Sequence, residues 1–166
     1  MLNVVNRDKR ISGRRLPIVW SILRKRLALE LTGSTPLEGG LRAYYWPDTD
    51  PGVVERWLKQ AVPHWEQQGY RLFAKTKDDT DSQIVGAMAR LVGRAVRLGY
   101  KKLRIVVVSG DAIFGDEFEE LRREYEGKIA LELIVYSWPS ALSVSLGRIA
   151  KRFRSLASVQ GLVRRT

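Results

Sequence analysis

The sequence predicts an α/β protein, with helices on both sides of a mostly parallel five-stranded sheet, giving three layers. Short β-rich runs alternate with helical runs along the chain, as expected for such a fold. Residues 103–108 are apolar apart from Arg104, the pattern of a strand covered by helices on each side, so this strand is expected to be central. The 166 residues, 45% of them hydrophobic, suit one core. We expect one domain over residues 1–159 and a basic tail over 160–166.

The first half of the chain is expected to supply three strands and two helices. The helices have apolar residues on one face, and the strands are short and β-rich. Gly33 ends the first helix, Pro47 ends the second strand, and Pro63 kinks the second helix because it removes a backbone hydrogen bond. In order, the predicted elements are a strand at 2–5, a helix at 16–31, a strand at 41–46, a helix at 51–68 and a strand at 70–74.

The second half is expected to continue the alternation. Thr80 or Asp81 is a suitable N-cap for a helix that stops at Gly99, and Gly127 follows a short acidic helix. Strands that follow one another through helices pair in parallel by right-handed crossovers. The predicted elements are a helix from Thr80 or Asp81, a strand at 103–108, a helix at 117–126, a strand at 129–136 and a helix at 140–159.

The chain is strongly basic, and the excess lies at its two ends. The net charge is +11, distributed as +6 over residues 1–42, −1 over 43–140 and +6 over 141–166. Such a charge favours an anionic partner. The alternative for any one arginine is a solvated surface position without a specific ligand.

Several protein classes are disfavoured by composition. The chain has no Cys and a single His, His64, so disulfides, thiolate metal sites and zinc centres lack ligands. No apolar run approaches the roughly 20 residues of a membrane span, and the basic residues 7–15 are not followed by a signal-peptide pattern. We expect a cytoplasmic protein that does not enter membranes.

The tripeptide Ser109, Gly110 and Asp111 follows the most apolar strand. In a parallel sheet the functional crevice lies beyond the carboxyl ends of the strands. Asp111 is therefore a candidate ligand for a divalent cation, and Asp81 in the acidic cluster of residues 78–81 is the candidate second carboxylate. The alternatives are a turn or helix-capping role for Asp111, and an N-cap role for Asp81.

Five segments together resemble a known family. They are SGDAIF after the apolar strand, LRAYYWPDTD with its aromatic pair Tyr44 and Tyr45, QQGYRLFAK from a helix end into a strand, KDDTDSQIVGAMARL at the start of a helix, and SVSLGRIAKRFRSL in the last predicted helix. In order and spacing, the chain from about residue 41 to 159 resembles an NYN domain of the LabA-like group, within the PIN-like nuclease superfamily. The resemblance implies a Rossmann-like (PIN-like) fold that binds RNA. Active members cleave RNA with Mg²⁺ or Mn²⁺ held by several Asp residues.

Carried over position by position, the family's acidic set is incomplete. Asp111 matches the first Asp of an SGDxD motif, and Asp81 the first Asp of the helix motif. Ile113 and Ala87 stand where second acids are expected, and the Asp that ends the first strand is replaced by Asn6 or displaced to Asp8. The predicted catalytic residues are Asp111 and Asp81, and the predicted metal ligands are Asp111, Asp81 and Asp8.

The expected function is an RNA-engaging domain, with a ribonuclease activity that depends on this reduced carboxylate set. The expected nucleic-acid contacts are polar, basic and aromatic side chains: Asn6, Ser109, Arg14, Arg15, Arg148, Arg152, Arg154, Tyr44 and Tyr45. The alternative is a pseudonuclease, a non-catalytic module that binds RNA or docks on an acidic protein or ribonucleoprotein partner. The sequence leaves the oligomeric state open.

Overall fold

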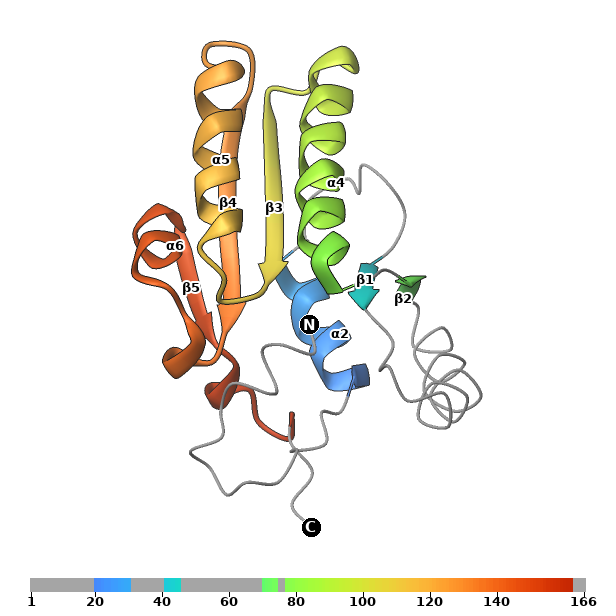
Figure 1. The fold of residues 1–166 in the computed structure, drawn as a ribbon, viewed down its shortest axis with the longest axis vertical. Helices are drawn as coiled ribbons and strands as arrows, with labels where there is room; N and C mark the ends of the chain where they lie inside the picture. Colours follow the sequence, from blue (N-terminus) through green and yellow to red (C-terminus); the bar gives the residue numbers. More distant parts are fainter. Residues whose placement is uncertain (1–19, 31–40, 46–69, 75–76, 163–166) are drawn as a thin grey trace.

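The computed structural model describes residues 20–30, 41–45, 70–74 and 77–162 (Figure 1). Its elements, in chain order, are α2 (Trp20–Glu30), β1 (Leu41–Tyr45), β2 (Tyr70–Ala74), α4 (Lys77–Arg97), β3 (Lys102–Val108), α5 (Ile113–Glu124), β4 (Ala130–Ser137), η2 (Pro139–Ala141), α6 (Val144–Ile149), β5 (Arg152–Ser155) and η3 (Leu156–Ser158). From β2 onward helices and strands alternate, so the chain is a mixed α/β protein as predicted.

All the strand pairings of the described residues are parallel. β1 pairs with β2, and β3, β4 and β5 form a three-stranded sheet in that order. In this sheet Val106 lies beside Ile134, which in turn lies beside Arg152. Among the described strands β4, and not β3 as the apolar run of residues 103–108 predicted, has a neighbour on each side.

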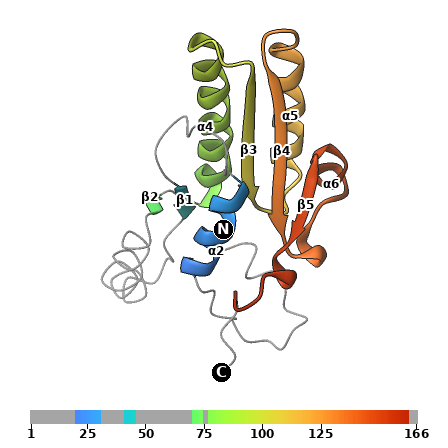
Figure 2. The same ribbon diagram turned by 180° about the vertical axis from the view of Figure 1, so that it is seen from behind.

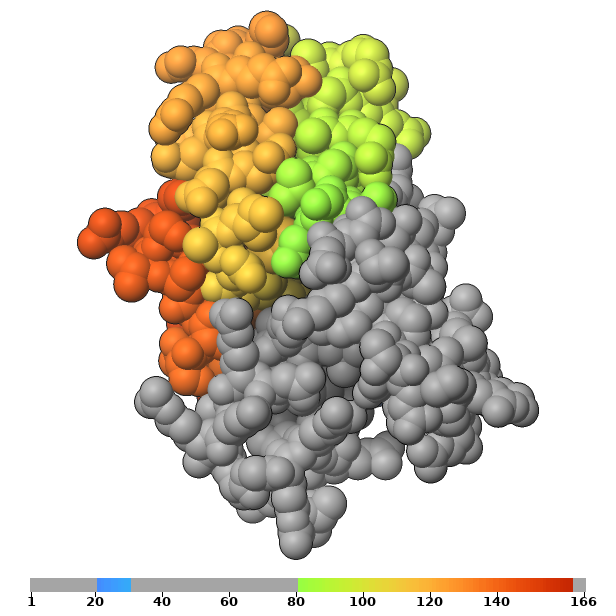
Figure 3. All heavy atoms as spheres, viewed as in Figure 1, coloured from blue at the N-terminus to red at the C-terminus, as the bar shows by residue number. Residues whose placement is uncertain are grey.

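Two hydrophobic clusters pack against opposite faces of the β3–β4–β5 sheet. Leu133 and Val135 belong to a cluster with residues of α4 and α5, whereas Ile134 and Tyr136 belong to a cluster with residues of α2. This alternation follows from the two-residue period of a strand. In the space-filling view α4 and α5 lie side by side over the first face (Figure 3), and α2 lies near the carboxyl ends of β3 and β4 on the other (Figure 2).

The sequence predicted most of these elements within a few residues. The strand at 70–74 agrees with β2, and the strands at 41–46, 103–108 and 129–136 agree with β1, β3 and β4 to within one residue at each end. The predicted strand at 2–5 and the predicted helix at 51–68, with Pro63, lie outside the described residues. Leu162, in the expected tail, is buried in the cluster that contains α2.

The predicted helix at 140–159 is wrong. This segment forms η2, the short helix α6, the edge strand β5 and η3. Its apolar residues Leu146, Ile149, Phe153 and Leu156 have a helical spacing, but Ala150 is extended and ends α6. The rest of the segment instead pairs with the open edge of β4, where the basic residues of β5 meet buried carboxylates.

Two predicted helix starts are also corrected. α4 begins at Lys77, so Thr80 and Asp81 lie inside the helix and neither is its N-cap. α5 begins at Ile113, four residues before the predicted start. The helix ends were better defined in the sequence, because Gly99 and Gly127 adopt positive φ angles of 76° and 72°, which favour glycine.

None of the helices in the described part of the chain is long and apolar enough to cross a membrane.

Candidate functional site

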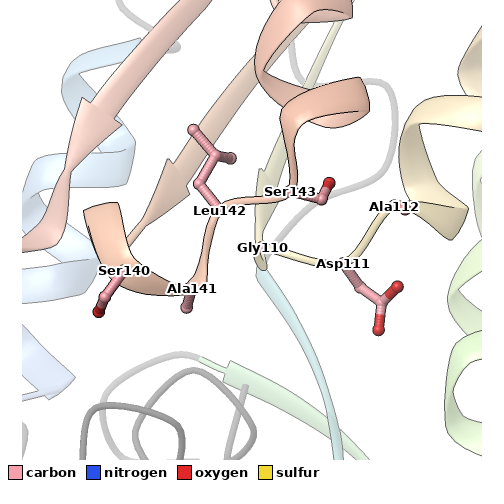
Figure 4. A pocket seen from close by; sticks show the side chains of 7 residues that line it. All are labelled: Gly110, Asp111, Ala112, Ser140, Ala141, Leu142 and Ser143. Atoms are coloured by element: carbon pink, nitrogen blue, oxygen red, sulfur yellow. The ribbon is translucent and has the colours of Figure 1, made fainter. Parts of the chain in front are cut away.

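A pocket lies at the carboxyl edge of the three-stranded sheet, between the loop that follows β3 and the segment that follows β4 (Figure 4). Its volume is about 340 Å³. The lining residues are Gly110, Asp111, Ala112, Ser140, Ala141, Leu142 and Ser143. This is the edge at which parallel α/β proteins bind ligands, and the tripeptide singled out in the sequence supplies two of the lining residues.

Gly110 is required here because two segments of backbone come very close. A Cβ atom built on Gly110 would lie 1.9 Å from the Ala141 carbonyl oxygen and 2.8 Å from Ser137 Oγ. The Gly110 carbonyl also accepts a hydrogen bond of 2.8 Å from the Ser143 amide. The glycine therefore lets the loop after β3 and the segment after β4 approach each other closely. This contact holds the two walls of the pocket together.

The SGD loop is ordered by its own side chains. Ser109 Oγ accepts a hydrogen bond of 3.2 Å from the Asp111 amide. Asp111 Oδ1 in turn accepts one of 3.3 Å from the amide of Ile113, the first residue of α5. The turn role considered for Asp111 is therefore present. A carboxylate can accept several hydrogen bonds. Asp111, which lines the pocket, can therefore still accept hydrogen bonds from a bound ligand.

Ser143 was missed by sequence reasoning. It is the N-cap of α6, and its Oγ accepts a hydrogen bond of 3.3 Å from the Leu146 amide. A Ser that precedes an apolar helical run is a capping signal, but this one was hidden because residues 140–159 were read as one helix. Ser140 also lines the pocket, so the segment that follows β4 contributes two serines to its lining (Figure 4).

Asp81 is the fifth residue of α4 and does not line the pocket. The first turns of α4 lie at the edge of the fold where β3 ends (Figure 1), and the Asp81 side chain is partly buried and makes a polar interaction of its own. Asn6 and Asp8 lie outside the described residues. No group of three or more Asp, Glu or His side chains that could hold a metal ion occurs within the part of the chain that the structure describes.

The donor set of the pocket decides how a divalent cation would fit. Asp111 supplies one carboxylate there. Mg²⁺ prefers oxygen ligands and is often held by one or two carboxylates together with water and substrate phosphate. The described residues therefore suit an ion that arrives with a phosphate, and do not form a cage for a resident ion. Ile113, 40% exposed, stands where the family resemblance places a second acid.

The predicted basic contacts have different surroundings. Arg148 is exposed on α6. Arg154 Nε donates to Glu30 Oε1 at 3.0 Å, and Arg152 Nη1 lies 3.9 Å from Glu30 Oε2, so both are partly neutralised. The side chains of Tyr44 and Tyr45 are not among those described, and Arg14 and Arg15 lie outside the described residues.

Two buried carboxylates organise the basic side chains on the α2 face of the sheet. Glu132 pairs with Lys151, Lys102 and Arg104, and these hydrogen bonds and charges lower its pKa to about 2. Burial alone would raise the pKa of Glu30, but hydrogen bonds from Tyr136 and Arg154 outweigh it and the pKa is lowered. Both carboxylates are therefore ionised at neutral pH.

The Tyr136 hydroxyl belongs to the same network. It is fully buried and donates a hydrogen bond of 2.9 Å to Glu30 Oε1. Burial, together with this negatively charged acceptor, raises the pKa of Tyr136 to about 12. The sequence marked Arg104 as an exception within an apolar strand, but gave no sign that two acids more than one hundred residues apart would share this face.

Comparisons with known proteins bear on the fold. No protein-family model and no curated protein matches the chain. The chain is similar to the crystal structure of a protein of unknown function from Vibrio parahaemolyticus, with a TM-score of 0.71 and 17% sequence identity, over 98% of this chain and 91% of that one. The similarity extends over nearly the whole of both chains, and at this identity it describes the fold alone.

Proposed function

We propose that this protein is an RNA-engaging domain of the NYN/PIN-like type. In this proposal residues 1–159 form one cytoplasmic domain, whose strands make a single mostly parallel five-stranded sheet in a three-layer fold. The observation that carries the proposal is the SGD loop. It follows a parallel strand, and Asp111 lines an open pocket at the carboxyl edge of the sheet. The basic composition of the chain supports a polyanionic partner.

The chemistry of the pocket favours a ribose over a phosphate as its direct contact. Without a cation, the Asp111 carboxylate repels a phosphate and accepts hydrogen bonds from hydroxyl groups. Ser140 and Ser143 line the opposite wall and add hydroxyl groups that donate and accept. The 2′-hydroxyl is the group by which a protein distinguishes RNA from DNA. Phosphates would then be contacted by basic side chains outside the pocket.

Metal-dependent cleavage of RNA is a second candidate, favoured by the position of Asp111 and by the start of α4 at the same edge of the fold. A divalent cation bound with substrate would stabilise negative charge on the phosphate and lower the pKa of a water molecule. Asp111 would hold it, with Asp81 as the second carboxylate of the proposal. The chain's own residues orient the RNA in either case.

RNA binding is tested with labelled 20-nucleotide RNA and DNA of the same sequence at low salt. We expect the protein to prefer RNA, and Asp111→Ala to reduce that preference roughly tenfold, because a hydrogen bond to a charged group contributes about 1.5–3 kcal/mol. Asp111→Asn keeps an acceptor for the Ile113 amide and isolates the effect of charge. Asp116→Asn, in the exposed first turn of α5, is the control with the same charge change.

Two outcomes would contradict the proposal. One is that the wild-type protein has no affinity for RNA at low salt. The other is that RNA and DNA bind equally in the wild type and in the Asp111 variants. Cleavage is measured separately in Mg²⁺ or Mn²⁺, where equal rates for the wild type and Asp111→Asn would remove Asp111 from catalysis and leave the binding proposal intact.

A further inference from the structure

Five basic side chains gather on the α2 face of the sheet, toward the amino ends of β3 and β4 and along β5. We call them the basic ladder: Lys102, Arg104, Lys151, Arg152 and Arg154. The register places Arg104 beside Glu132 and Arg154 beside Tyr136, on the face where Tyr136 packs with α2. Lys151 directly precedes β5, and it reaches Glu132 from the other side of β4. The cations thus come from β3 and from β5 with the residue before it, and β4 between them contributes Glu132.

Glu132 holds three members of the ladder in place. Its side chain is 8% exposed, and it pairs with Lys102 at 3.0 Å, with Arg104 at 3.3 Å, and with Lys151. Arg104 is also held by α2, because its Nη1 donates to the Glu30 carbonyl at 2.6 Å. Lys102 and Lys151 remain 56% and 54% exposed. Since an ammonium group has three donors, both lysines can bind a further anion.

Glu30 holds the two remaining members of the ladder, Arg152 and Arg154, in place. Arg154 donates to it, and Arg152 lies at 3.9 Å. These two arginines remain 39% and 44% exposed. A residue in a strand advances about 3.3 Å, so Lys151 and Arg154 are roughly 10 Å apart along the edge strand. Exposed cations therefore recur along this edge, and two carboxylates that stay ionised hold their charged groups in place.

The surface has more positive than negative charge. The ladder has five cations, and the two carboxylates that it surrounds leave a net charge of +3 among these described residues. No ladder residue lines the pocket at the SGD loop. The ladder is thus a second charged surface, one that the function of the pocket does not explain.

We propose that the basic ladder binds the phosphodiester backbone of RNA, on a surface separate from the pocket that contains Asp111. The inference rests on the proposed RNA-binding function and specifies where the phosphates lie. Arg and Lys recognise phosphate oxygens by charge-assisted hydrogen bonds. The ladder itself contains no aromatic side chain, and Tyr136 beside it is buried, so bases have no stacking partner among these residues. Contacts with phosphate alone carry no sequence information.

The same features favour a nucleic acid over an acidic protein. Protein interfaces usually depend on buried aromatic or apolar anchors at their centre. At the centre of the ladder are Arg104 and Glu132, both committed to ion pairs. Binding is therefore expected to be independent of base sequence and to weaken steeply with salt, because each phosphate contact releases counterions.

The test compares the Lys102→Ala/Lys151→Ala double variant with the wild type in binding of 20-nucleotide poly(U) and poly(A) across a salt series. Each phosphate contact to a single strand contributes about −0.7 to the slope of log K against log salt. We expect the double variant to lose about 1.4 units of slope and on the order of tenfold in affinity at low salt, equally for both RNAs. Arg90→Ala/Arg122→Ala, with two exposed arginines on α4 and α5, is the control with the same charge change.

Arg152→Ala provides a second variant with a small expected effect on folding, because its ion pair with Glu30, among the described residues, is long at 3.9 Å. It is expected to lose about 0.7 units of slope. If both variants keep the wild-type slope and the wild-type affinity for RNA, the ladder does not bind the RNA backbone, and the proposed function still stands. No RNA binding by the wild type would overturn both. Tighter binding of polyglutamate than of RNA, lost in the double variant, would instead assign the ladder to an acidic protein.

Discussion

The two faces of the β3–β4–β5 sheet differ in the interactions that stabilise them. On one face, Leu133 and Val135 pack against buried apolar residues of α4 and α5. On the other, an apolar half under α2 adjoins an ionic half, in which Glu132 and Glu30 gather the basic ladder. Both faces arise from the same strands, because successive side chains point in opposite directions. The first face therefore packs mainly through buried apolar side chains, whereas the second combines burial with directional polar contacts.

The apolar face should show the largest response to a single substitution. Phe118 of α5 is 1% exposed within its cluster. Phe118→Ala removes a ring and leaves a cavity, so we expect the free energy of unfolding to fall by about 3–5 kcal/mol. The loss should be the same at low and high salt in urea denaturation. A loss that shrinks markedly with salt would mean that this face also depends on charge.

Glu30 should show an intermediate response on the ionic face. Glu30→Ala leaves the fully buried Tyr136 hydroxyl without its acceptor, at an expected cost of about 1–3 kcal/mol. Glu30→Gln keeps an oxygen for that hydrogen bond and should cost less. Tyr136→Phe removes the donor, so the Glu30→Ala and Tyr136→Phe effects should be less than additive. Strict additivity in a double-mutant cycle would show that the two groups do not interact.

Glu132 should show the smallest effect at neutral pH and the clearest dependence on pH. The full pKa shift of Glu132 would correspond to roughly 3 kcal/mol. Its lysine partners are more than half exposed and solvent screens these pairs, so Glu132→Gln should cost about 1 kcal/mol. Its pKa is about 2 in the folded protein, against 4.5 ordinarily, so its contribution to stability is present above pH 4.5 and is lost as the pH falls towards 2. Denaturation of the wild type and the variant should therefore converge over that range. A constant difference between them would contradict the low pKa.

Local patterns were sufficient for most of the described elements. The β-rich runs gave β1 to β4, and Gly99 and Gly127 marked where helices end, because only glycine adopts their backbone angles readily. The helix predicted for residues 140–159 was wrong for a physical reason. Its apolar spacing suits a helix, but a free strand edge and two buried carboxylates compete for the same residues. A competition of that kind is invisible in a local pattern.

The candidate site was predicted in part. The SGD tripeptide and the expected position of a crevice in a parallel sheet led to Asp111, which does line the pocket. The opposite wall was missed, since the close approach of Gly110 to Ala141 joins residues 31 positions apart. Asp81 was expected as an N-cap or as a ligand, and the structure places it inside α4. Its role as a second carboxylate remains part of the proposal.

By itself, the sequence determined the alternation of strands and helices, the basic balance of the chain and the loop that carries Asp111, because period, charge and turn chemistry are properties of short segments. Only the tertiary structure decided that Arg152 and Arg154 lie on a strand, and that Glu30 and Glu132 each collect basic side chains on one face. Burying a carboxylate is favourable only when several donors converge on it. Such convergence depends on which segments become neighbours in space.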